Sequence, residues 1–353
     1  MNEHALRNIL EGGGGAAGAA ARAALWLPGK AYGLAMRARR AMYEHGLFHR
    51  HAAPVPVVSV GNITAGGSGK TPFVVMLADH LAAFGHTPAI LLRGYRESAD
   101  GISDEAALYR RACPTALTYA HSNRTASARQ AVRDGATILL MDDGFQHLRL
   151  RRDLDIVLID ATAPWGGGNT IPGGLLREPP AALANADALV VTRSDQAPRA
   201  VPAIRERLAH FSTAPVFTAR HKPARLHTLS GETIPLSRLA GLPVAALAGI
   251  ARPEAFCATL EQLGARIIAR FATNDHGEIP PGLVAQAVET AKNAEGVVVT
   301  TEKDREKRFL RESTDNIVDS HSIWVLGIEQ DMDEKNAFFS LVDKRLAALA
   351  DSG

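Results

Sequence analysis

Residues 64–71 of the sequence, Thr-Ala-Gly-Gly-Ser-Gly-Lys-Thr, have the composition and order of a phosphate-binding loop. Its glycines allow consecutive backbone N–H groups to curl around phosphate oxygens, and the N-terminus of a following helix adds a partial positive charge. In such a loop Lys70 reaches the β- and γ-phosphates of a nucleotide, and the hydroxyl of Thr71 coordinates Mg²⁺. The residues predicted to bind the nucleotide are Thr64, Ala65, Gly66, Gly67, Ser68, Gly69, Lys70 and Thr71.

The loop differs from the usual pattern at its first position, where Thr64 replaces a glycine, and a plain glycine-rich turn is the alternative interpretation. The flanking sequence favours phosphate binding. An apolar run from Val55 to Val60 precedes the loop as a predicted strand, and Phe73 to Phe84 follows it as a predicted helix. Pro72 suits the first turn of that helix, where no intrahelical N–H bond is needed.

A second acidic motif follows the apolar run Thr137 to Met141, which leads directly into Asp142 and Asp143. In nucleotide-binding proteins, carboxylates at this place hold Mg²⁺, which bridges the β- and γ-phosphate oxygens and neutralises developing charge. We predict a Mg²⁺ site made by Thr71, Asp142 and Asp143, and the sequence does not say which carboxylate ligates the metal directly. Two solvated aspartates in a turn before a glycine are the alternative.

Phosphoryl transfer also requires an acceptor hydroxyl and a group that orients or deprotonates it. Two polar segments are candidates: Asp104-Glu105, and Asn274-Asp275-His276 in the second half of the chain. The hypothesis is that Asp104 from one domain and His276 from the other meet over a cleft, where the carboxylate raises the basicity of the imidazole. Asp104 is equally well interpreted as a helix N-cap, and His276 is one of 13 histidines.

Basic residues in two loops are candidates for binding an anionic substrate. Arg124 follows Ser122-Asn123, and Arg177 lies in the run Gly-Gly-Leu-Leu-Arg-Glu-Pro at 173–179. A guanidinium group presents a fork of donors that suits phosphate or carboxylate. Either arginine can instead form an ordinary surface ion pair.

Motifs that the chain lacks narrow the class of protein. No Asn-Lys-x-Asp motif is present to read a guanine base, which favours ATP. Ala65 stands where partitioning-type ATPases carry a second lysine, and there is no Cys-x-x-Cys or His-rich metal motif. A nucleotide-switched or metal-delivery protein is therefore disfavoured, which leaves an ATP-dependent kinase, with a soluble small-molecule kinase or ligase among the alternatives.

The composition is that of an ordinary globular protein, with 353 residues, 46% hydrophobic and 22% charged, which is long enough for two domains. A net charge of +2 argues against nucleic acid as a partner. Cys113 and Cys257 are far apart and without metal-ligand spacing, which favours a reducing compartment. We find no apolar run near the roughly 18 residues needed to span a bilayer and no signal peptide, and we infer no obligate protein partner.

The first fifty residues are basic, with seven Lys or Arg against three Glu. Residues 11–21 are rich in Gly and Ala and are predicted to be a flexible lead-in without assigned function. From Ala24 to Phe48, aromatic and apolar residues alternate with arginines, as in a helix that lies on an anionic membrane surface. A helix that packs on its own domain is the alternative.

The rest of the chain alternates predicted strands and helices, which predicts an α/β fold with a mostly parallel sheet and helices on both faces. A change in composition near 215–235 separates a second, smaller α/β unit. We expect three regions: 1–50 as lead-in and interfacial helix, 51–220 as the P-loop kinase domain, and 221–353 as a C-terminal α/β domain that closes over the site. The predicted strands are 55–60, 89–92, 117–119, 137–141, 156–159, 188–191, 216–219, 244–247, 266–271, 297–300 and 323–326, and the predicted helices are 73–84, 104–112, 125–133, 253–263, 283–291 and 335–349.

These features together resemble the tetraacyldisaccharide 4′-kinase family, the lipid A 4′-kinases, from Leu25 to about Trp324. Several long motifs occur in the family's order, so coincidence is improbable. The motifs that carry the resemblance are Pro-Val-Pro-Val-Val-Ser-Val-Gly-Asn-Ile-Thr-Ala-Gly-Gly-Ser-Gly-Lys-Thr-Pro (54–72), Leu-Leu-Arg-Gly-Tyr (91–95), Met-Asp-Asp-Gly-Phe-Gln-His (141–147), Leu-Leu-Arg-Glu-Pro (175–179), Ala-Gly-Ile-Ala-Arg-Pro-Glu-Ala-Phe (248–256) and Val-Thr-Thr-Glu-Lys-Asp (299–304).

The resemblance implies transfer of the γ-phosphate of ATP, with Mg²⁺, to the 4′-hydroxyl of a lipid A disaccharide 1-phosphate, which yields lipid IVA. It implies a peripheral protein on the cytoplasmic, anionic face of the inner membrane, with the basic N-terminal helix as anchor. It also implies that Asp104 and His276 form a catalytic pair, and that the substrate is bound by Arg124, Arg177 and Gln146.

The chain departs from the family pattern beside the predicted catalytic pair. Glu105 is followed by Ala106, where the family usually has proline, and Gly277 stands where many members have a second histidine or an aromatic residue. The acyl chains accepted, the oligomeric state and the extent of domain closure are not determined by the sequence.

Overall fold

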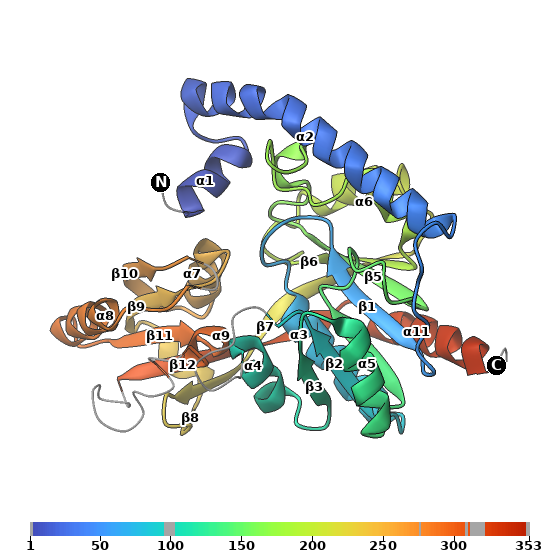
Figure 1. Cartoon of the computed structure of the whole chain (residues 1–353). Coiled ribbons are helices and arrows are strands. Elements are labelled where there is room, and N and C mark those ends of the chain that lie inside the picture. The colour runs from blue at the N-terminus through green and yellow to red at the C-terminus, as the bar shows by residue number, and fades with distance from the viewer. Residues whose placement is uncertain (1–2, 95–102, 275–276, 308–309, 311–321, 351–353) are drawn as a thin grey trace. The chain divides into compact units, whose positions relative to one another are not determined.

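The structure is a computed structural model of the chain, and it describes residues 3–94, 103–274, 277–307, 310 and 322–350 (Figure 1). The chain divides into two compact units. Unit 1 comprises Met1–Arg96, Tyr109–His221 and Gln330–Gly353, and unit 2 comprises Glu97–Leu108 and Lys222–Glu329.

Unit 1 contains a parallel sheet whose strands lie in the order β7-β6-β5-β1-β4-β2-β3. Five of them, β1, β2, β4, β5 and β6, consist entirely of buried residues, as expected where helices cover both faces of a parallel sheet. The strands are β1 (Val57–Asn62), β2 (Pro88–Leu92), β3 (Leu117–Ala120), β4 (Ile138–Asp142), β5 (Leu154–Asp160), β6 (Ala188–Thr192) and β7 (Val216–Thr228).

The strand order explains why helices lie on both faces of this sheet. Because parallel crossovers are right-handed, connections that run in opposite directions along the sheet place their helices on opposite faces. The connection from β1 to β2 carries α3 (Lys70–Ala83), and the return from β3 to β4 carries α5 (Arg124–Arg133). Helix α6 (Val201–Ala209) follows β6 in the direction of α5, so α5 and α6 share a face.

The direction of the connections reverses at β1, which lies between β4 and β5. Val60 of β1 pairs with Asp142 at the end of β4, so both strands end at the same edge of the sheet. In open α/β sheets, ligands bind at the carboxyl ends of the strands where the order reverses. This topology therefore places the glycine-rich loop beside the two aspartates, as predicted.

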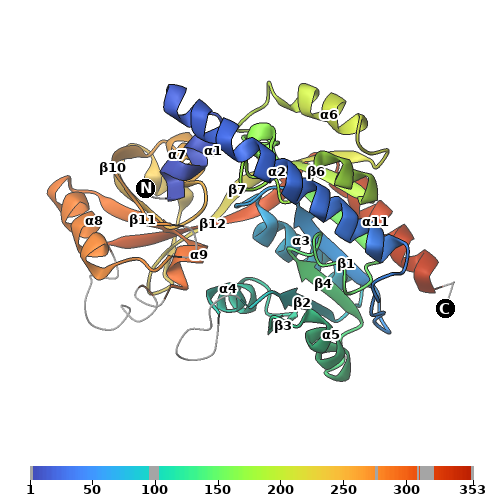
Figure 2. The same ribbon diagram turned by 45° about the horizontal axis from the view of Figure 1, so that its top comes forward.

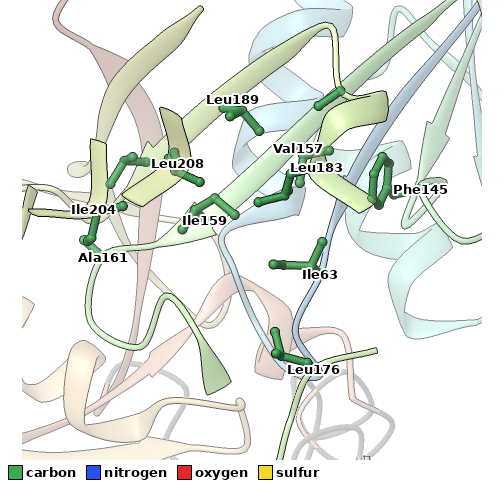
Figure 3. Packing of buried hydrophobic residues seen from close by; sticks show 12 residues of the cluster. Ile63, Phe145, Val157, Ile159, Ala161, Leu176, Leu183, Leu189, Ile204 and Leu208 are labelled. Atoms are coloured by element: carbon green, nitrogen blue, oxygen red, sulfur yellow. The ribbon is translucent and has the colours of Figure 1, made fainter. Parts of the chain in front are cut away.

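One core cluster of unit 1 connects the segments that carry the predicted site residues (Figure 3). Ile63 precedes the glycine-rich loop, Phe145 follows Asp142 and Asp143, and Leu176 precedes Arg177, and all three are almost fully buried in this cluster. Burial of each such side chain contributes about 1.5–3 kcal/mol. Gly61 permits this packing, because a Cβ at this position would lie 2.5 Å from the Cβ of Phe145.

The N-terminal region differs from the expected flexible lead-in. Helix α1 (Glu3–Leu10) is followed by a glycine turn and by α2 (Gly15–Glu44), so residues 15–21 belong to a long helix. Gly12 and Gly14 have φ angles of 119° and 80°, which glycine adopts without strain. The Gly-rich composition therefore serves a tight helix–helix turn, visible at the N-terminal end of α2 in Figures 1 and 2.

Unit 2 contains the parallel strands β10-β9-β11-β12, and β8 pairs antiparallel with β7. Apolar clusters lie on both faces of this sheet, one including Phe256 and Leu260 of α7, the other Val284 and Ala287 of α8. The elements are β8 (Thr233–Ile234), β9 (Pro243–Ala248), α7 (Pro253–Gln262), β10 (Arg266–Ala272), α8 (Pro281–Asn293), β11 (Val297–Thr301), α9 (Glu302–Arg305) and β12 (Ile323–Met332).

The last helix, α11 (Lys335–Ala350), differs from the expected domain organisation, in which 221–353 forms the C-terminal domain. It belongs to unit 1, where the ring of Phe338 contacts Phe73 of α3 and the ring of Phe339 stacks on His80. Phe338 also contacts Phe217 of β7, so α11 packs on both α3 and the sheet of unit 1. Among the described helices none is long and apolar enough to cross a membrane.

Helix α4 (Asp104–Ala112) also differs from the expected domain organisation, because the boundary between the two units falls inside this helix. Its first residues, 104–108, belong to unit 2 rather than to the kinase domain assigned from the sequence. Asn274 and Gly277 also belong to unit 2. Asp104 and the segment around His276 are therefore parts of the same unit, and not of two domains as the sequence suggested.

Candidate functional site

The glycine-rich loop connects β1 to α3 as predicted, and two of its glycines have conformations that other residues rarely adopt. Gly66 has a φ angle of 114° and Gly69 a φ angle of 80°. Gly69 is the residue that immediately precedes α3, so the loop passes directly into the helix N-terminus at Lys70. The backbone N–H groups of the first turn of α3 therefore lie at the loop, as anion binding requires.

Asn62, at the end of β1, holds the loop from inside. Its side-chain amide donates to the carbonyl oxygen of Thr64 at 2.8 Å and to that of Gly66 at 3.4 Å. Its Oδ1 accepts a hydrogen bond from Lys70 at 3.3 Å. Asn62 is fully buried, so these bonds are shielded from water and fix the shape of the loop.

The segment that carries Arg177 runs antiparallel to the first residues of the loop. The N–H of Ala65 donates to the carbonyl of Leu175 at 2.7 Å, and the N–H of Arg177 donates to the carbonyl of Ile63 at 2.8 Å. Between these bonds, Thr64 forms a β-bridge with Leu176. The Leu-Leu-Arg run thus acts as a short strand that fixes both the loop and its own arginine.

The other side of the loop is held by residues that follow β6. Thr192 donates from its hydroxyl to the carbonyl of Ser68 at 2.9 Å, and Arg193 donates to the carbonyl of Gly67 at 3.0 Å. Arg193 is also paired with the buried carboxylate of Asp160 at the end of β5. These contacts leave the loop little freedom to rearrange, which reduces the entropic cost of binding a phosphate.

Lys70, Asp143 and Arg177 form a cluster of charges beside the loop. The ammonium nitrogen of Lys70 lies 3.2 Å from Asp143 Oδ1, and Arg177 Nη1 lies 2.6 Å from Asp143 Oδ2. Burial raises the pKa of the Asp143 carboxyl, but the charges of Lys70 and Arg177 outweigh it and hold that pKa well below its usual range. Asp143 is therefore ionised at neutral pH, and its two cationic partners lie beside the glycine-rich loop.

Asp142 lies at the end of β4 with only 7% of its surface exposed. Its Oδ2 accepts a hydrogen bond from the hydroxyl of Tyr109 at 2.9 Å, which fixes the orientation of the carboxylate. Carboxylate and hydroxyl oxygens of Asp142, Asp143 and Thr71 are the kinds of ligand that Mg²⁺ takes, with phosphate oxygens and water completing its shell. The donor set fits the predicted metal. Within the described ranges, no group of three or more His, Cys, Asp or Glu forms a separate metal site.

Arg124 stabilises the backbone turn of the two aspartates. Its guanidinium donates to the carbonyl of Asp142 at 2.5 Å and to the carbonyl of Asp143 at 2.9 Å. Asp143 has a φ angle of 53°, a conformation that costs about 1–3 kcal/mol for a residue other than glycine. The side chain of Arg124 is buried, and these bonds offset the strain of the turn.

Gln146 lies next to the end of β1. Its Nε2 donates to the carbonyl of Asn62 at 2.9 Å, and its own carbonyl accepts a hydrogen bond from Arg39 of α2 at 3.1 Å. Of the three residues expected to bind substrate, Gln146 and Arg124 thus contact backbone groups, and Arg177 contacts Asp143. Their predicted contacts with substrate stay a prediction.

The predicted catalytic pair is only partly described by the structure. Asp104 is the first residue of α4 and not its N-cap, because the hydroxyl of Ser103 accepts the capping hydrogen bond from the N–H of Ala106 at 3.2 Å. His276 lies outside the described residues. The geometry of the pair is therefore not part of the site as described, and their roles stay predictions.

A buried polar network in unit 2 involves two of the motifs in its sequence. Lys307 Nζ lies 2.8 Å from Asp304 Oδ1 and donates to the carbonyl of Gly249 at 2.8 Å, while Asp304 Oδ2 accepts from the N–H of Gly249 at 3.0 Å. Thr301 also donates to Asp304. A Cβ on Gly249 would lie 2.5 Å from the hydroxyl of Thr273, just before the segment of His276. This network fixes the ends of β9 and β11.

Helix α2 has two distinct faces in unit 1. On the buried face, Gly29 and Gly33 approach Thr170 closely, and Arg40 forms a buried ion pair with Glu178 at 2.6 Å. The other face exposes apolar side chains: Trp26 is 50% exposed, and Leu27 and Leu34 are each 68% exposed. Packing on the domain therefore accounts for one face and leaves an apolar stripe uncovered within the described unit.

Sequence reasoning identified the loop, both aspartates and Arg177, but missed residues that position them. Tyr109, Thr192 and Arg193 give no signal in the sequence, because their partners are distant along the chain. Asn62 was missed although its partners are close in sequence. For Asn62 a signal was available, since it is the last residue of the strand before the loop.

The sequence family described as Tetraacyldisaccharide-1-P 4′-kinase matches residues 21–347 of the chain. The protein named Tetraacyldisaccharide 4′-kinase from Syntrophus aciditrophicus (strain SB) is 39% identical over 297 residues, which cover 76% of this chain and 79% of that protein. The protein of the same name from Anaeromyxobacter dehalogenans (strain 2CP-C) is 41% identical over 314 residues, which cover 82% of each chain.

A solved structure is also similar to this chain over most of its length. The crystal structure described as the "apo" form of LpxK from Aquifex aeolicus in complex with ATP matches this structure with a TM-score of 0.70 and 25% sequence identity. The match covers 92% of this chain and 99% of that chain. At this coverage the similarity extends over both units.

Proposed function

The chain belongs to the tetraacyldisaccharide-1-P 4′-kinase family, and we propose that, as an ATP-dependent kinase, it phosphorylates the 4′-hydroxyl of a tetraacyldisaccharide 1-phosphate to give lipid IVA. The observation that carries the proposal is the placement of Lys70 beside Asp143 at the carboxyl ends of β1 and β4. This arrangement brings a cation for the phosphates next to carboxylates for a metal, inside a chain that matches the family over residues 21–347.

The residues of the phosphate loop supply binding and electrostatic stabilisation. Backbone N–H groups from the loop and the first turn of α3 face the phosphates, and Lys70 reaches the transferred group. When Lys70 turns to the γ-phosphate it exchanges Asp143 for a phosphate oxygen at little cost in desolvation. Arg177 binds the other oxygen of Asp143, and its charge can stabilise the negative charge that develops on the transferred phosphate.

Mg²⁺ is proposed as the metal, held by Asp142 and Asp143 with the hydroxyl of Thr71. When bound, it neutralises charge on the phosphate oxygens during transfer. Asp142 is held in orientation by Tyr109, and Asp143 is ionised at neutral pH, so both carboxylates are prepared for a cation.

Asp104 and His276 are proposed as the pair that orients and deprotonates the acceptor hydroxyl, on the basis of the family resemblance of these segments. Asp104→Asn and His276→Ala should each slow turnover by about 10²- to 10⁴-fold while ATP binding is retained. Near-normal turnover in both variants would mean that loop and metal accelerate the transfer without a base.

We propose that the uncovered stripe of α2 contacts the anionic, cytoplasmic surface of the inner membrane. Trp26, Leu27 and Leu34 are exposed, and Lys30 and Arg37 are exposed between them. Apolar side chains that insert at the headgroup level, next to cations that attract anionic lipids, are typical of interfacial helices. This would bring the kinase to a lipid acceptor that does not dissolve in water.

The kinase assignment is tested by incubating the protein with γ-labelled ATP, Mg²⁺ and detergent-dispersed tetraacyldisaccharide 1-phosphate. We expect a labelled lipid that disappears with Lys70→Ala and persists with Lys292→Ala, which removes an exposed lysine of α8. Binding of ATP without any labelled lipid would contradict the acceptor assignment. Label on a water-soluble hydroxyl acceptor would then favour the soluble-kinase hypothesis.

The membrane assignment is tested by flotation with phosphatidylethanolamine vesicles that contain phosphatidylglycerol. Leu27→Ser with Leu34→Ser should weaken binding at least about 10-fold, since burial of each leucine contributes about 1.5–3 kcal/mol. The matched control is Phe84→Ser, because Phe84 is 66% exposed but follows α3. Equal flotation of all three proteins would show that α2 does not make the contact.

A further inference from the structure

We propose that Arg7 of helix α1 is an additional ligand for the nucleotide's polyphosphate, supplied to the phosphate loop from the N-terminal arm of this chain. The proposal deepens the proposed function and rests on it for the identity of the nucleotide. Arg7 lies before the region that matches the family, which begins at residue 21. The match with the family therefore does not include Arg7.

The guanidinium group of Arg7 lies directly against the phosphate loop. A Cβ added to Gly66 would meet Arg7 Nη2 at 2.2 Å and Arg7 Cζ at 2.8 Å, so the guanidinium occupies the place of a side chain at position 66. Gly66 is fixed from its other side by the hydrogen bond from Asn62 to its carbonyl oxygen. Arg7 thus contacts the loop at a residue whose position is set.

Helix α1 is held in this place by contacts at its C-terminal end. Arg22 of α2 donates to the carbonyls of Ile9 and Gly13 at 2.7 and 2.8 Å, which ties the end of α1 and the glycine turn to α2. Leu10 is 7% exposed, and its carbonyl lies where a Cβ of Gly167 would be. These contacts pre-organise Arg7, so less side-chain entropy is lost when it binds an anion.

The charges around the loop explain why a polyphosphate, rather than a carboxylate, suits this arginine. Asp143 is already neutralised by Lys70 and Arg177, and an incoming nucleotide adds several negative charges at the loop. A guanidinium presents five N–H donors in a planar fork that matches phosphate oxygens. At Gly66 the fork lies beside the backbone that encloses the phosphates, which makes bidentate contact geometrically accessible.

The primary experiment measures dissociation constants of ATP, ADP and adenosine by calorimetry at low salt for the full chain and three variants. Arg7→Ala should weaken the binding of ATP and ADP about 10-fold, which corresponds to the loss of one charge-assisted hydrogen bond, and should leave the binding of adenosine unchanged. Arg7→Lys should lie between, because it keeps the charge without the fork. The matched control is Arg266→Ala, which removes an exposed arginine at the start of β10 in unit 2.

A double-mutant cycle tests the route through α1. Arg22→Ala removes the bonds that hold α1 and should also weaken ATP binding. The double variant Arg22→Ala with Arg7→Ala should bind ATP no more weakly than Arg7→Ala alone. Fully additive losses would mean that Arg22 acts independently of Arg7.

Three results would overturn the assignment of Arg7. Unchanged ATP affinity in Arg7→Ala excludes a phosphate contact, and tighter ATP binding would make α1 an obstruction of the loop. An unchanged dissociation constant for ATP together with a raised KM for the lipid acceptor would show that Arg7 binds the 1-phosphate of the acceptor and not the nucleotide. Failure of the proposed function itself would look different, because the wild-type chain would bind ATP with Arg7-dependent affinity and label no lipid.

Discussion

The ammonium group of Lys70 and the carboxylate of Asp143 lie 3.2 Å apart, although one begins helix α3 and the other follows strand β4. Arg177 lies on the second oxygen of the same carboxylate at 2.6 Å. Two cations therefore share one carboxylate, at the position where we propose that a nucleotide brings several negative charges. We expect binding of the nucleotide to exchange partners among these groups, so that two cations are already in place for the charges it brings.

This relationship predicts different effects for the two members of the pair. Lys70→Ala should weaken ATP binding and lower turnover at least about 100-fold, because a donor to the transferred phosphate is lost. Asp143→Asn should leave ATP binding intact, since both cations remain, and should lower Mg²⁺-dependent turnover by a similar factor. Steady-state kinetics and ATP titrations on both variants provide the measurement. Normal Mg²⁺-dependent turnover in Asp143→Asn would exclude it as a metal ligand.

Tyr109 is expected to act on the reaction through Asp142. Tyr109→Phe removes the hydrogen bond to the buried carboxylate, and a bond to a charged group is worth about 1.5–3 kcal/mol. We expect a higher Mg²⁺ concentration for half-maximal activity and a loss of turnover of about 10-fold. Tyr119→Phe is the control, because the hydroxyl of Tyr119 bonds to exposed Asp134 at 2.6 Å and not to the site. An unchanged Mg²⁺ requirement in Tyr109→Phe would contradict this role.

The ion pair of Asp304 and Lys307 should stabilise unit 2 far more strongly than an exposed pair does. Its side chains are 0% and 2% exposed, so Asp304→Ala leaves a buried ammonium without its partner and should cost about 3–5 kcal/mol of unfolding free energy. Glu261→Ala breaks the pair with Arg270, whose side chains are 51% and 60% exposed, and should cost less than about 1 kcal/mol. Urea unfolding of both variants makes the comparison. Equal costs would show that the network does not stabilise the unit.

The lowered pKa of His147 predicts that the protein loses stability in acid. Burial and the nearby arginines, Arg124 first among them, lower the pKa of His147 from 6.5 to about 4. The unfolded chain therefore binds a proton at this residue before the folded protein does, so the unfolding free energy is highest above pH 6.5 and falls as the pH drops towards about 4. His147→Gln should show a smaller fall over this window in chemical unfolding at each pH. An identical pH dependence in both proteins would assign the titration to other groups.

The sequence was sufficient for those parts of the fold and site that depend on neighbouring residues. The strand before the loop, the loop itself and the helix after it are contiguous, and the apolar run into Asp142 and Asp143 has the same local character. The α/β class follows from the alternation of elements, and the family from motifs that match residue by residue. Local order therefore predicted the loop, the strand and helix that flank it, and the place of the two aspartates beside it.

Partners that are distant in the chain could not be predicted in this way. No spacing indicates that Tyr109 bonds Asp142, that Arg193 holds the loop at Gly67, or that α11 returns to unit 1 and packs on α3. The composition of the Gly-rich segment predicts a flexible lead-in, because composition does not reveal that positive φ angles serve a turn between two packed helices.

The sequence by itself determined which groups we propose as reactive, since Lys70, Thr71 and the two aspartates belong to contiguous motifs whose chemistry follows from residue type and order. Only the tertiary structure decided how these groups are held and charged. The ionised state of Asp143, the strained turn stabilised by Arg124, and the approach of Arg7 to Gly66 arise from contacts across the fold. The physical reason is that electrostatic and packing energies depend on distance in space, which the order of residues does not specify.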